Sequence, residues 1–337
     1  MSVSTSSSAV TTARPARRRW GRFSPAASLG IMALLALAAV VLFMTLDARG
    51  SWSFIIPFRG RKLLGIALVG TAIAASTVMF QTITNNRILT PSIMGFDSLY
   101  MLVQTVMVYF LGSASLMRID VNLRFAFEVG VMMLFSGLLY YFLFVVGHRS
   151  LHLLVLVGIV FGLMVRSFTN LLQRVMDPTE FAVLQDAGFA SFNSIDRDLL
   201  LVSGVVVGLV LLGVWRMRYT LDLLALGRDM AINLGVNYRR SVMLVLAAVS
   251  ALVSVSTALV GPITFFGLLV ANLAYALVRS YRHGVIIAAA ALLAILTLVT
   301  GQLVLERVFA FDTSLSIIVE FVGGLVFIYL LVRGVVR

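Results

Sequence analysis

The chain has 337 residues, of which 61% are hydrophobic and only 12% are charged. Soluble domains carry about 25% charged residues, because their surface faces water. This composition excludes a water-soluble protein, and the long apolar runs exclude an outer-membrane barrel, whose strands alternate in polarity. The absence of cysteine excludes disulfides, thiol catalysis and cysteine-held metal clusters. We therefore expect an all-α polytopic membrane protein, since helices satisfy their own backbone groups in a bilayer.

The N-terminus is Ser/Thr-rich and then basic, and an apolar stretch at 28–46 follows it. That stretch is long enough to cross a bilayer. A cleaved secretory signal is the alternative, but no small-residue cleavage pattern precedes Asp47 and Arg49. We expect residues 1–27 to form a cytoplasmic basic tail and residues 28–337 to form a single transmembrane domain.

Apolar segments predict about ten spans, each near the length that a hydrocarbon core of roughly 30 Å requires. In chain order they are 28–46, 63–83, 94–112, 124–146, 151–172, 198–215, 240–260, 263–280, 284–305 and 315–334. The arginines favour cytoplasmic termini by the positive-inside rule, and hence a multi-pass protein of the cytoplasmic (inner) membrane. The basic cluster at 59–62 lies on the outer side of this topology and breaks the rule. The net charge of +12 is then an orientation signal that meets lipid headgroups, and no nucleic-acid motif accompanies it.

The predicted cytoplasmic loop from Arg216 to Arg240 is long for a connection between membrane helices. Its apolar residues recur at spacings of three and four, which places them on one face of a helix: Leu223, Leu226, Met230 and Leu234. Gly227 weakens that helix and Gly235 suits its C-terminal cap. The residues alone leave two interpretations open, an amphipathic helix on the membrane surface and a docking helix for a soluble partner.

The stretch from Leu226 to Val236 resembles the ATPase-coupling loop of the iron-siderophore and cobalamin (FecCD-like) permease family of ABC importers. Other stretches resemble the same family in the same order over about residues 30–334. They are Arg59–Leu64 with the helix ending at Gln81, Asn85–Gly95, Gly261–Leu268, and the last span through Gly323 and Gly324. Three departures mark a divergent branch: Asn86-Arg87 replaces Asn-Pro, Ala271-Asn272 replaces Pro-His, and Asp312-Thr-Ser replaces Glu-Leu-Pro. That branch is similar to the one for catecholate-type siderophores.

The resemblance implies the permease of a type II ABC importer that carries a ferric siderophore across the cytoplasmic membrane. The chain has no Walker-type phosphate loop, so we expect no enzyme activity and no cofactor, with ATP and magnesium on partner ATPases. The implied partners are a pair of ATP-binding subunits, a second permease that is a paralogue rather than a copy, and an extracytoplasmic substrate-binding protein. The alternatives are a cobalamin or haem importer of the same fold, and an ion-coupled secondary transporter that uses Glu320 and the Gly/Pro-rich stretch 261–267.

The resemblance also implies roles for particular residues. The ATPase-coupling residues are Leu226, Gly227, Arg228, Asp229, Ala231, Leu234 and Gly235. The residues that dock the binding protein are Arg59, Arg61, Lys62 and Arg307, with lipid phosphate as the alternative ligand. The candidates for the translocation path are Gln81, Asn85, Arg166 and Glu320.

Ionisable residues within spans are costly, so each needs a function or a partner. We expect Glu128 to snorkel to the outer interface, and Arg166 either to line the path or to pair with Glu320. The histidines (His148, His152 and His283) are scattered, and we expect no metal site. Small residues favour close helix contacts, so Gly158, Gly162 and Ser167, with Gly323 and Gly324, are candidates for the permease–permease interface, and packing between helices of one chain is the alternative.

Overall fold

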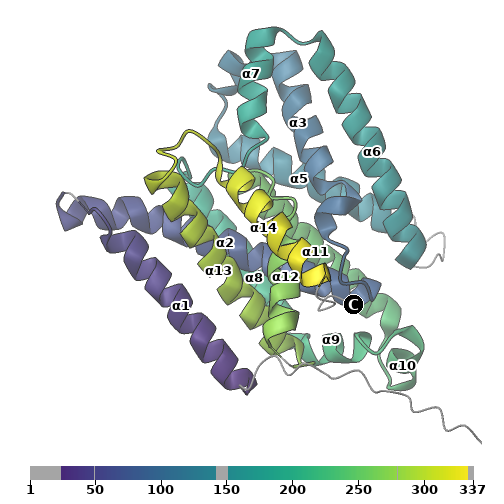
Figure 1. Ribbon diagram of the computed structural model, residues 1–337. Coiled ribbons are helices and arrows are strands. Elements are labelled where there is room, and N and C mark those ends of the chain that lie inside the picture. Colours follow the sequence, from purple (N-terminus) through teal and green to yellow (C-terminus); the bar gives the residue numbers. More distant parts are fainter. Residues whose placement is uncertain (1–23, 49, 142–150, 279, 333–337) are drawn as a thin grey trace, which may run out of the picture.

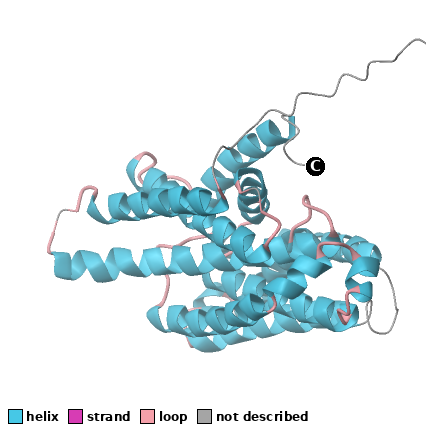
Figure 2. Cartoon of the chain, turned by 90° about the horizontal axis from the view of Figure 1, so that it is seen from below, coloured by secondary structure: helices cyan, strands magenta, loops and turns pink. Residues whose placement is uncertain are grey.

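The computed structural model describes residues 24–48, 50–141, 151–278 and 280–332. The arginines of the predicted tail and those at 149, 333 and 337 lie outside these ranges, as do His148 and most of the connection at 142–150. The described part is built from helices and connecting loops, without strands (Figures 1 and 2). The predicted all-α fold is confirmed.

Among the described residues, seven helices are long and apolar enough to cross a membrane. They are α1 (Pro25–Thr45), α2 (Trp52–Thr84), α5 (Val121–Tyr140), α6 (Leu151–Val175), α8 (Arg197–Arg216), α11 (Tyr238–Val260) and α13 (His283–Arg307). Three shorter apolar helices complete the set: α3 (Phe96–Leu111), α12 (Phe266–Leu277) and α14 (Leu315–Val332). Together these helices overlap all the predicted spans.

The remaining helical elements are short. They are η1 (Pro91–Met94), α4 (Ser113–Leu116), α7 (Pro178–Ala187), α9 (Arg218–Leu224) and α10 (Arg228–Asn233). The sequence pattern did not predict α7, because it lies in a polar stretch. Its start is nevertheless marked by a capping residue, since Asp177 accepts a hydrogen bond from Thr179 N at 2.8 Å and Pro178 occupies the first helical position.

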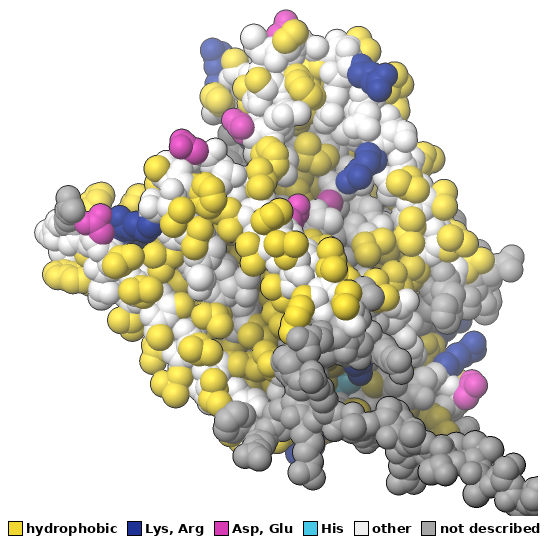
Figure 3. Space-filling model, in the orientation of Figure 1, with side chains coloured by type: hydrophobic (Ala, Val, Ile, Leu, Met, Phe, Trp, Pro, Cys, Tyr) yellow, Lys and Arg dark blue, Asp and Glu magenta, His cyan; other side chains and the backbone are white. Residues whose placement is uncertain are grey.

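Helices α2 and α11 form the centre of the bundle. Their apolar windows are 67% and 72% buried, whereas that of α1 is 22% buried. The buried side of α2 carries small side chains, among them Ala72, Ala74 and Ala75. Small side chains let neighbouring helices approach closely, and α2 accordingly packs against α11, α12 and α13. The large apolar side chains of the outer helices stay exposed, and Figure 3 shows hydrophobic side chains spread widely over the face in view.

The short helices α3 and α12 each begin at a turn inside the bundle. Gly95 precedes α3 with a φ of 97°, and Gly261 ends α11 with a φ of 95°. Both values lie in the left-handed region, which glycine adopts without strain. A Cβ on Gly162 would lie 2.8 Å from Gly95 Cα, and one on Gly158 would lie 2.9 Å from Met94 Cε. The small residues of α6 are therefore needed for the approach of η1 to α6 within one chain.

For three of the predicted interface residues, the structure favours the alternative, packing between helices of one chain. Gly158 and Gly162 are buried against η1, and a Cβ on Gly323 would lie 3.0 Å from Leu269 Cδ2. These glycines pack helices of the same chain, so they do not present a free face to a second permease. Gly324 has open space at its Cβ position, and Ser167 is exposed with its hydroxyl donating to Leu163 O.

We expect Gly162→Ala to destabilise the permease by about 1–3 kcal/mol, because the added methyl group meets the backbone of Gly95, which cannot move aside as a flexible side chain would. Gly208→Ala on α8 is the matched control, since nothing lies within 4 Å of its Cβ position. That control should leave stability unchanged or raise it by roughly 0.5–1 kcal/mol, because glycine weakens a helix. Thermal unfolding of the purified variants in detergent measures both. Equal melting temperatures for the two variants would contradict the packing described above.

Candidate functional site

The loop between α8 and α11 folds into two short helices, α9 and α10, that meet at Gly227. Gly227 has a φ of 93°, and α10 starts there, with Ala231 N donating to Gly227 O at 3.0 Å. Gly235 has a φ of 85° and follows the end of α10, where Val236 N donates to Ala231 O at 3.0 Å. The predicted turn at Gly227 and cap at Gly235 are both present. The four apolar residues predicted on one helical face do not share one helix, because α9 ends at Leu224 and α10 begins at Arg228.

The folded loop has both buried and exposed apolar side chains. Leu221, Leu224 and Ala231 are buried against the bundle. The loop also carries four exposed apolar side chains, Leu226, Met230, Ile232 and Leu234, and we call this set the coupling face. Ala231 was predicted as a point of close approach for a partner, but its side chain is 0% exposed and supports α10 from within. Arg228 and Asp229 are exposed beside the coupling face.

A buried chain of hydrogen bonds joins this loop to the bundle. Asp222 Oδ1 on α9 accepts from His283 N at 2.7 Å and lies 2.7 Å from His283 Nδ1. On the other side of the ring, His283 Nε2 lies 2.7 Å from Thr82 Oγ1 on α2. Asp222 thus caps the first turn of α13, and the imidazole links α9, α13 and α2. The sequence pattern missed this relay, because its three residues are far apart in the chain.

A second group of contacts fixes the turn that follows α2. The main-chain oxygen of Arg87 accepts from Gln81 Nε2 at 2.7 Å and from Asn272 Nδ2 at 3.0 Å, and the Arg87 guanidinium lies over the Tyr275 ring. Gln81 is buried in this contact, so the structure gives it a role in holding the turn. Asn85 is exposed and ends α2 in a left-handed conformation with a φ of 49°. Asn272 stands where the family pattern has histidine.

The predicted path residues Arg166 and Glu320 both lie near Asp97, which the sequence pattern did not predict as a site residue. Arg166 on α6 is exposed and Glu320 on α14 is partly buried, and both lie close enough to Asp97 to act on its charge. The described residues contain no ion pair between Arg166 and Glu320. Asp97 lies in the first turn of α3, directly after the Gly95 turn. A carboxylate at the start of an unusually short span was the signal that could have identified it.

Glu128 is buried between α3 and α5, which corrects the expectation that it snorkels to the interface. Arg124 Nε lies 2.8 Å from Glu128 Oε1, and Arg124 Nη2 donates to Gln104 Oε1 at 2.8 Å. The arginine, which is one turn away on α5, reaches the buried carboxylate and neutralises it.

The outer basic cluster is largely engaged in contacts within the chain. Lys62 is 6% exposed, and its Nζ lies 2.9 Å from Glu306 Oε1 on α13. Arg59 donates to Phe43 O at 2.8 Å and to Leu46 O at 3.0 Å, at the C-terminal end of α1. Cations stabilise helix C-termini, which gives the predicted violation of the positive-inside rule a structural reason. The predicted exposed docking site therefore does not include Lys62.

Two residues of the predicted docking group remain accessible. Arg307 is exposed and pairs with Asp47, at 2.7 Å between Nη1 and Oδ2. Arg61 is exposed, with only a 3.4 Å contact from its Nε to Pro57 O. These two guanidinium groups are the members of the group that a partner can reach.

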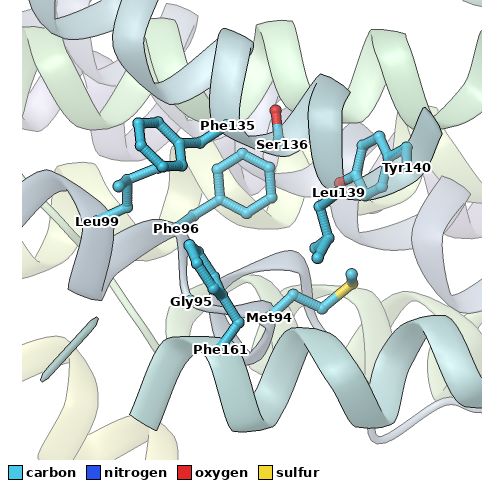
Figure 4. Close-up of a pocket in the computed structure, with 9 residues that line it drawn as sticks. All are labelled: Met94, Gly95, Phe96, Leu99, Phe135, Ser136, Leu139, Tyr140 and Phe161. Atoms are coloured by element: carbon cyan, nitrogen blue, oxygen red, sulfur yellow. The ribbon is translucent and has the colours of Figure 1, made fainter. Parts of the chain in front are cut away.

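An apolar pocket lies between α3, α5 and α6 (Figure 4). Its lining includes Phe96, Phe135 and Phe161, and the rings of Phe135 and Phe161 are stacked with centroids 6.3 Å apart. Such a pocket does not suit an anionic iron chelate. Within the described ranges, no group of three or more His, Cys, Asp or Glu residues is placed to hold a metal ion.

Comparison with known proteins supplies the family. The FecCD transport family matches residues 23–333. The chain is 47% identical over 305 residues to the petrobactin import system permease protein YclO of Bacillus subtilis, covering 90% of this chain and 96% of YclO. It is also similar to two petrobactin import system permease proteins of Bacillus anthracis. FatC is 34% identical (98% of this chain, 93% of FatC), and FatD is 26% identical (90% of each).

A solved structure shares the fold. It is an inward-facing conformation of a putative metal-chelate type ABC transporter, with a TM-score of 0.80, 22% identity, and coverage of 92% of this chain and 100% of that one. The arrangement of helices around α2 and α11 is thus one that a solved transporter also adopts. Together with the match over residues 23–333, this places the protein in the FecCD transport family.

Proposed function

We propose that this chain is the membrane-spanning permease of an ABC importer that carries a ferric siderophore of the catecholate type into the cytoplasm. The observation that carries the proposal is the coupling face, a set of four exposed apolar side chains on a loop that is otherwise folded and packed. Exposed apolar clusters on compact elements are typical of partner-binding surfaces. The names of YclO and FatC, which are petrobactin permeases, support the substrate class.

The proposed partner at the coupling face is a nucleotide-binding subunit that holds ATP and magnesium. This assignment puts α9 and α10 on the cytoplasmic side. Figure 1 shows α1 beginning, and α14 ending, toward the part of the view that contains α9 and α10. That arrangement supports cytoplasmic termini and an inner-membrane location.

The Asp222–His283–Thr82 relay suits the transmission of motion from the ATPase to the bundle. His283 is buried, and each of its ring nitrogens has a partner on a different helix. A rigid connection of this kind moves α9, the start of α13 and the end of α2 together. The end of α2 also holds the turn at Arg87 through Gln81, so a displacement of the loop reaches the turn that leads to α3.

Substrate is proposed to enter from the opposite side, delivered by a binding protein that contacts Arg61 and Arg307. Arg166 is an exposed cation whose charge acts on Asp97, and it suits contact with an anionic ferric chelate. One chain offers one coupling loop, whereas an ABC ATPase works as a pair of subunits, so a second permease is required. The similarity of this chain to both FatC and FatD of one organism supports a paralogue as that second chain.

The proposed function is tested with Met230→Asp in the complete importer. Met230 is 61% exposed at the coupling face, so a carboxylate there should not disturb the fold but should be buried unpaired on docking. We expect co-purification of the nucleotide-binding subunit and ATP-dependent uptake of a ferric catecholate siderophore to fall by more than about tenfold. Met117→Asp, at a methionine near α4 that is 80% exposed, is the control and should retain both. The proposal fails if the wild-type chain recruits no nucleotide-binding subunit.

The relay is tested with His283→Ala. Removing the ring breaks its links to Thr82 and to the Asp222 carboxylate. A hydrogen bond to a charged group contributes about 1.5–3 kcal/mol. We expect ATP hydrolysis to continue while the siderophore transported per ATP drops about tenfold or more, measured in proteoliposomes. Tyr281→Ala, two residues away and exposed, should keep the wild-type ratio. A wild-type ratio in His283→Ala would show that the relay only stabilises the loop.

Arg61→Glu tests docking of the binding protein more cleanly than a change at Arg59 or Lys62, whose contacts lie within the chain. We expect weaker capture of the loaded binding protein at low salt, and a smaller loss as salt rises, because exposed charges are screened over about 10 Å at 0.1 M. Surface plasmon resonance over a salt series measures this dependence. Arg282→Glu, an exposed arginine beside His283, is the control and should have no effect. Equal affinities for Arg61→Glu and the wild type at low salt would favour a lipid contact.

A further inference from the structure

A small cavity lies where the two interrupted regions meet. One side is the turn from Thr90 through η1 to α3, and the other is the turn from Gly261 to α12, with α2 and α11 closing the remaining sides. The cavity has room for about one water-sized sphere. It lies apart from the coupling face and from the aromatic pocket of Figure 4.

The lining is rich in oxygen atoms. Six hydroxyl side chains surround the cavity: Ser76, Thr77, Thr90, Ser92, Thr257 and Thr264. Asp97 is the single carboxylate in the lining and is 8% exposed. Its side chain faces the hydroxyls of Ser92 and Thr264, and its Oδ2 is buried without a hydrogen-bond partner. A buried carboxylate oxygen without a partner is costly, so a missing ligand is expected there.

The surrounding charges do not balance. Of the described charged side chains, Glu320 and Arg166 act on Asp97. Glu320 has the same sign as Asp97, and the described cation that acts on Asp97, Arg166, is exposed to solvent, so it does not compensate the buried carboxylate. Uncompensated charge inside a membrane protein is expensive and is normally neutralised by a partner. One positive charge at the cavity would complete the balance.

We propose that this cavity is a binding site for a monovalent alkali cation, held by Asp97 together with the hydroxyls of Ser92 and Thr264. Hard cations take oxygen ligands, and interrupted membrane helices provide them from side chains and freed carbonyl groups. A divalent ion would call for more carboxylates than the one that lines the cavity. The bound cation ties the turn before α3 to the turn before α12, and so fixes the distance between the two halves of the bundle at this point.

The test uses the complete importer in lipid nanodiscs at constant ionic strength. Thermal unfolding is compared in sodium, lithium or potassium chloride against choline chloride, and binding of radioactive sodium is measured directly. We expect at least one alkali cation to raise the melting temperature of the wild type by several degrees, with about one site per permease chain. Asp97→Asn should abolish the difference between salts, and Thr264→Val should reduce cation affinity about tenfold. Asp198→Asn, at an exposed position in the first turn of α8, is the control and should behave as the wild type does.

Three outcomes overturn the proposal. The first is a melting temperature of the wild type that is the same in all four salts. The second is a cation effect that survives in both Asp97→Asn and Thr264→Val. The third is a stability that follows pH and not the cation, which would mean that Asp97 carries a proton. None of them bears on the assignment of the permease, which rests on the coupling face.

Discussion

A chain in a bilayer can interrupt a helix only where other protein groups cover the freed backbone groups. The described part of this protein has two such interruptions, before α3 and before α12, and much of its packing serves to cover them. The first is covered by α6, whose glycines allow η1 to come within backbone contact. The second is covered by the non-helical segment after α7, where Ser191 N donates to Val260 O at 2.8 Å and Ala190 N donates to Ser316 Oγ at 2.8 Å. Residues far apart in the chain are thereby fixed against the same two turns.

Because α2 lies at the centre of the bundle, it connects these turns to the loop at which the partner ATPase is proposed to bind. In its last third, Ser76 and Thr77 line the cavity between the two turns. At the end of the helix, Thr82 contacts His283, and His283 contacts Asp222 in the loop of α9 and α10. The helix is apolar enough to span a membrane, yet most of its apolar window is buried within the protein. A movement of the coupling loop therefore has a short, buried route to the interrupted helices. Such a route is what a transporter driven from one side of the membrane requires.

The membrane-spanning helices carry few charged side chains, and several of these are paired with an opposite charge or with carbonyl groups at a helix end. Lys62 with Glu306 and Arg124 with Glu128 are ion pairs between or along membrane helices, and Arg59 covers the carbonyl groups at the end of α1. These contacts explain why α2 begins at Trp52, well before the apolar run that predicted it, since Arg59 and Lys62 find their partners within the chain. The group around Asp97 stands out because the buried carboxylate is not compensated and because one carboxylate oxygen has no donor.

The amino-acid sequence by itself determined the class of protein, the positions of the apolar spans and the glycine turns of the coupling loop. These properties follow from local composition and spacing, which no tertiary contact needs to supply. The sequence also placed Gly227, Gly235 and the short spans correctly, because glycine conformations and span lengths are local. Only the tertiary structure decided which side chains are free. In the folded chain Lys62 and Ala231 are buried, and Gly158 and Gly162 pack against the segment of η1 and Gly95. Asp97 lies close enough to Arg166 and Glu320 for their charges to act on it. Burial and pairing depend on residues from distant helices. In a chain this apolar, the helix side that faces lipid and the side that faces protein have the same composition, so hydrophobic periodicity cannot tell the two sides apart.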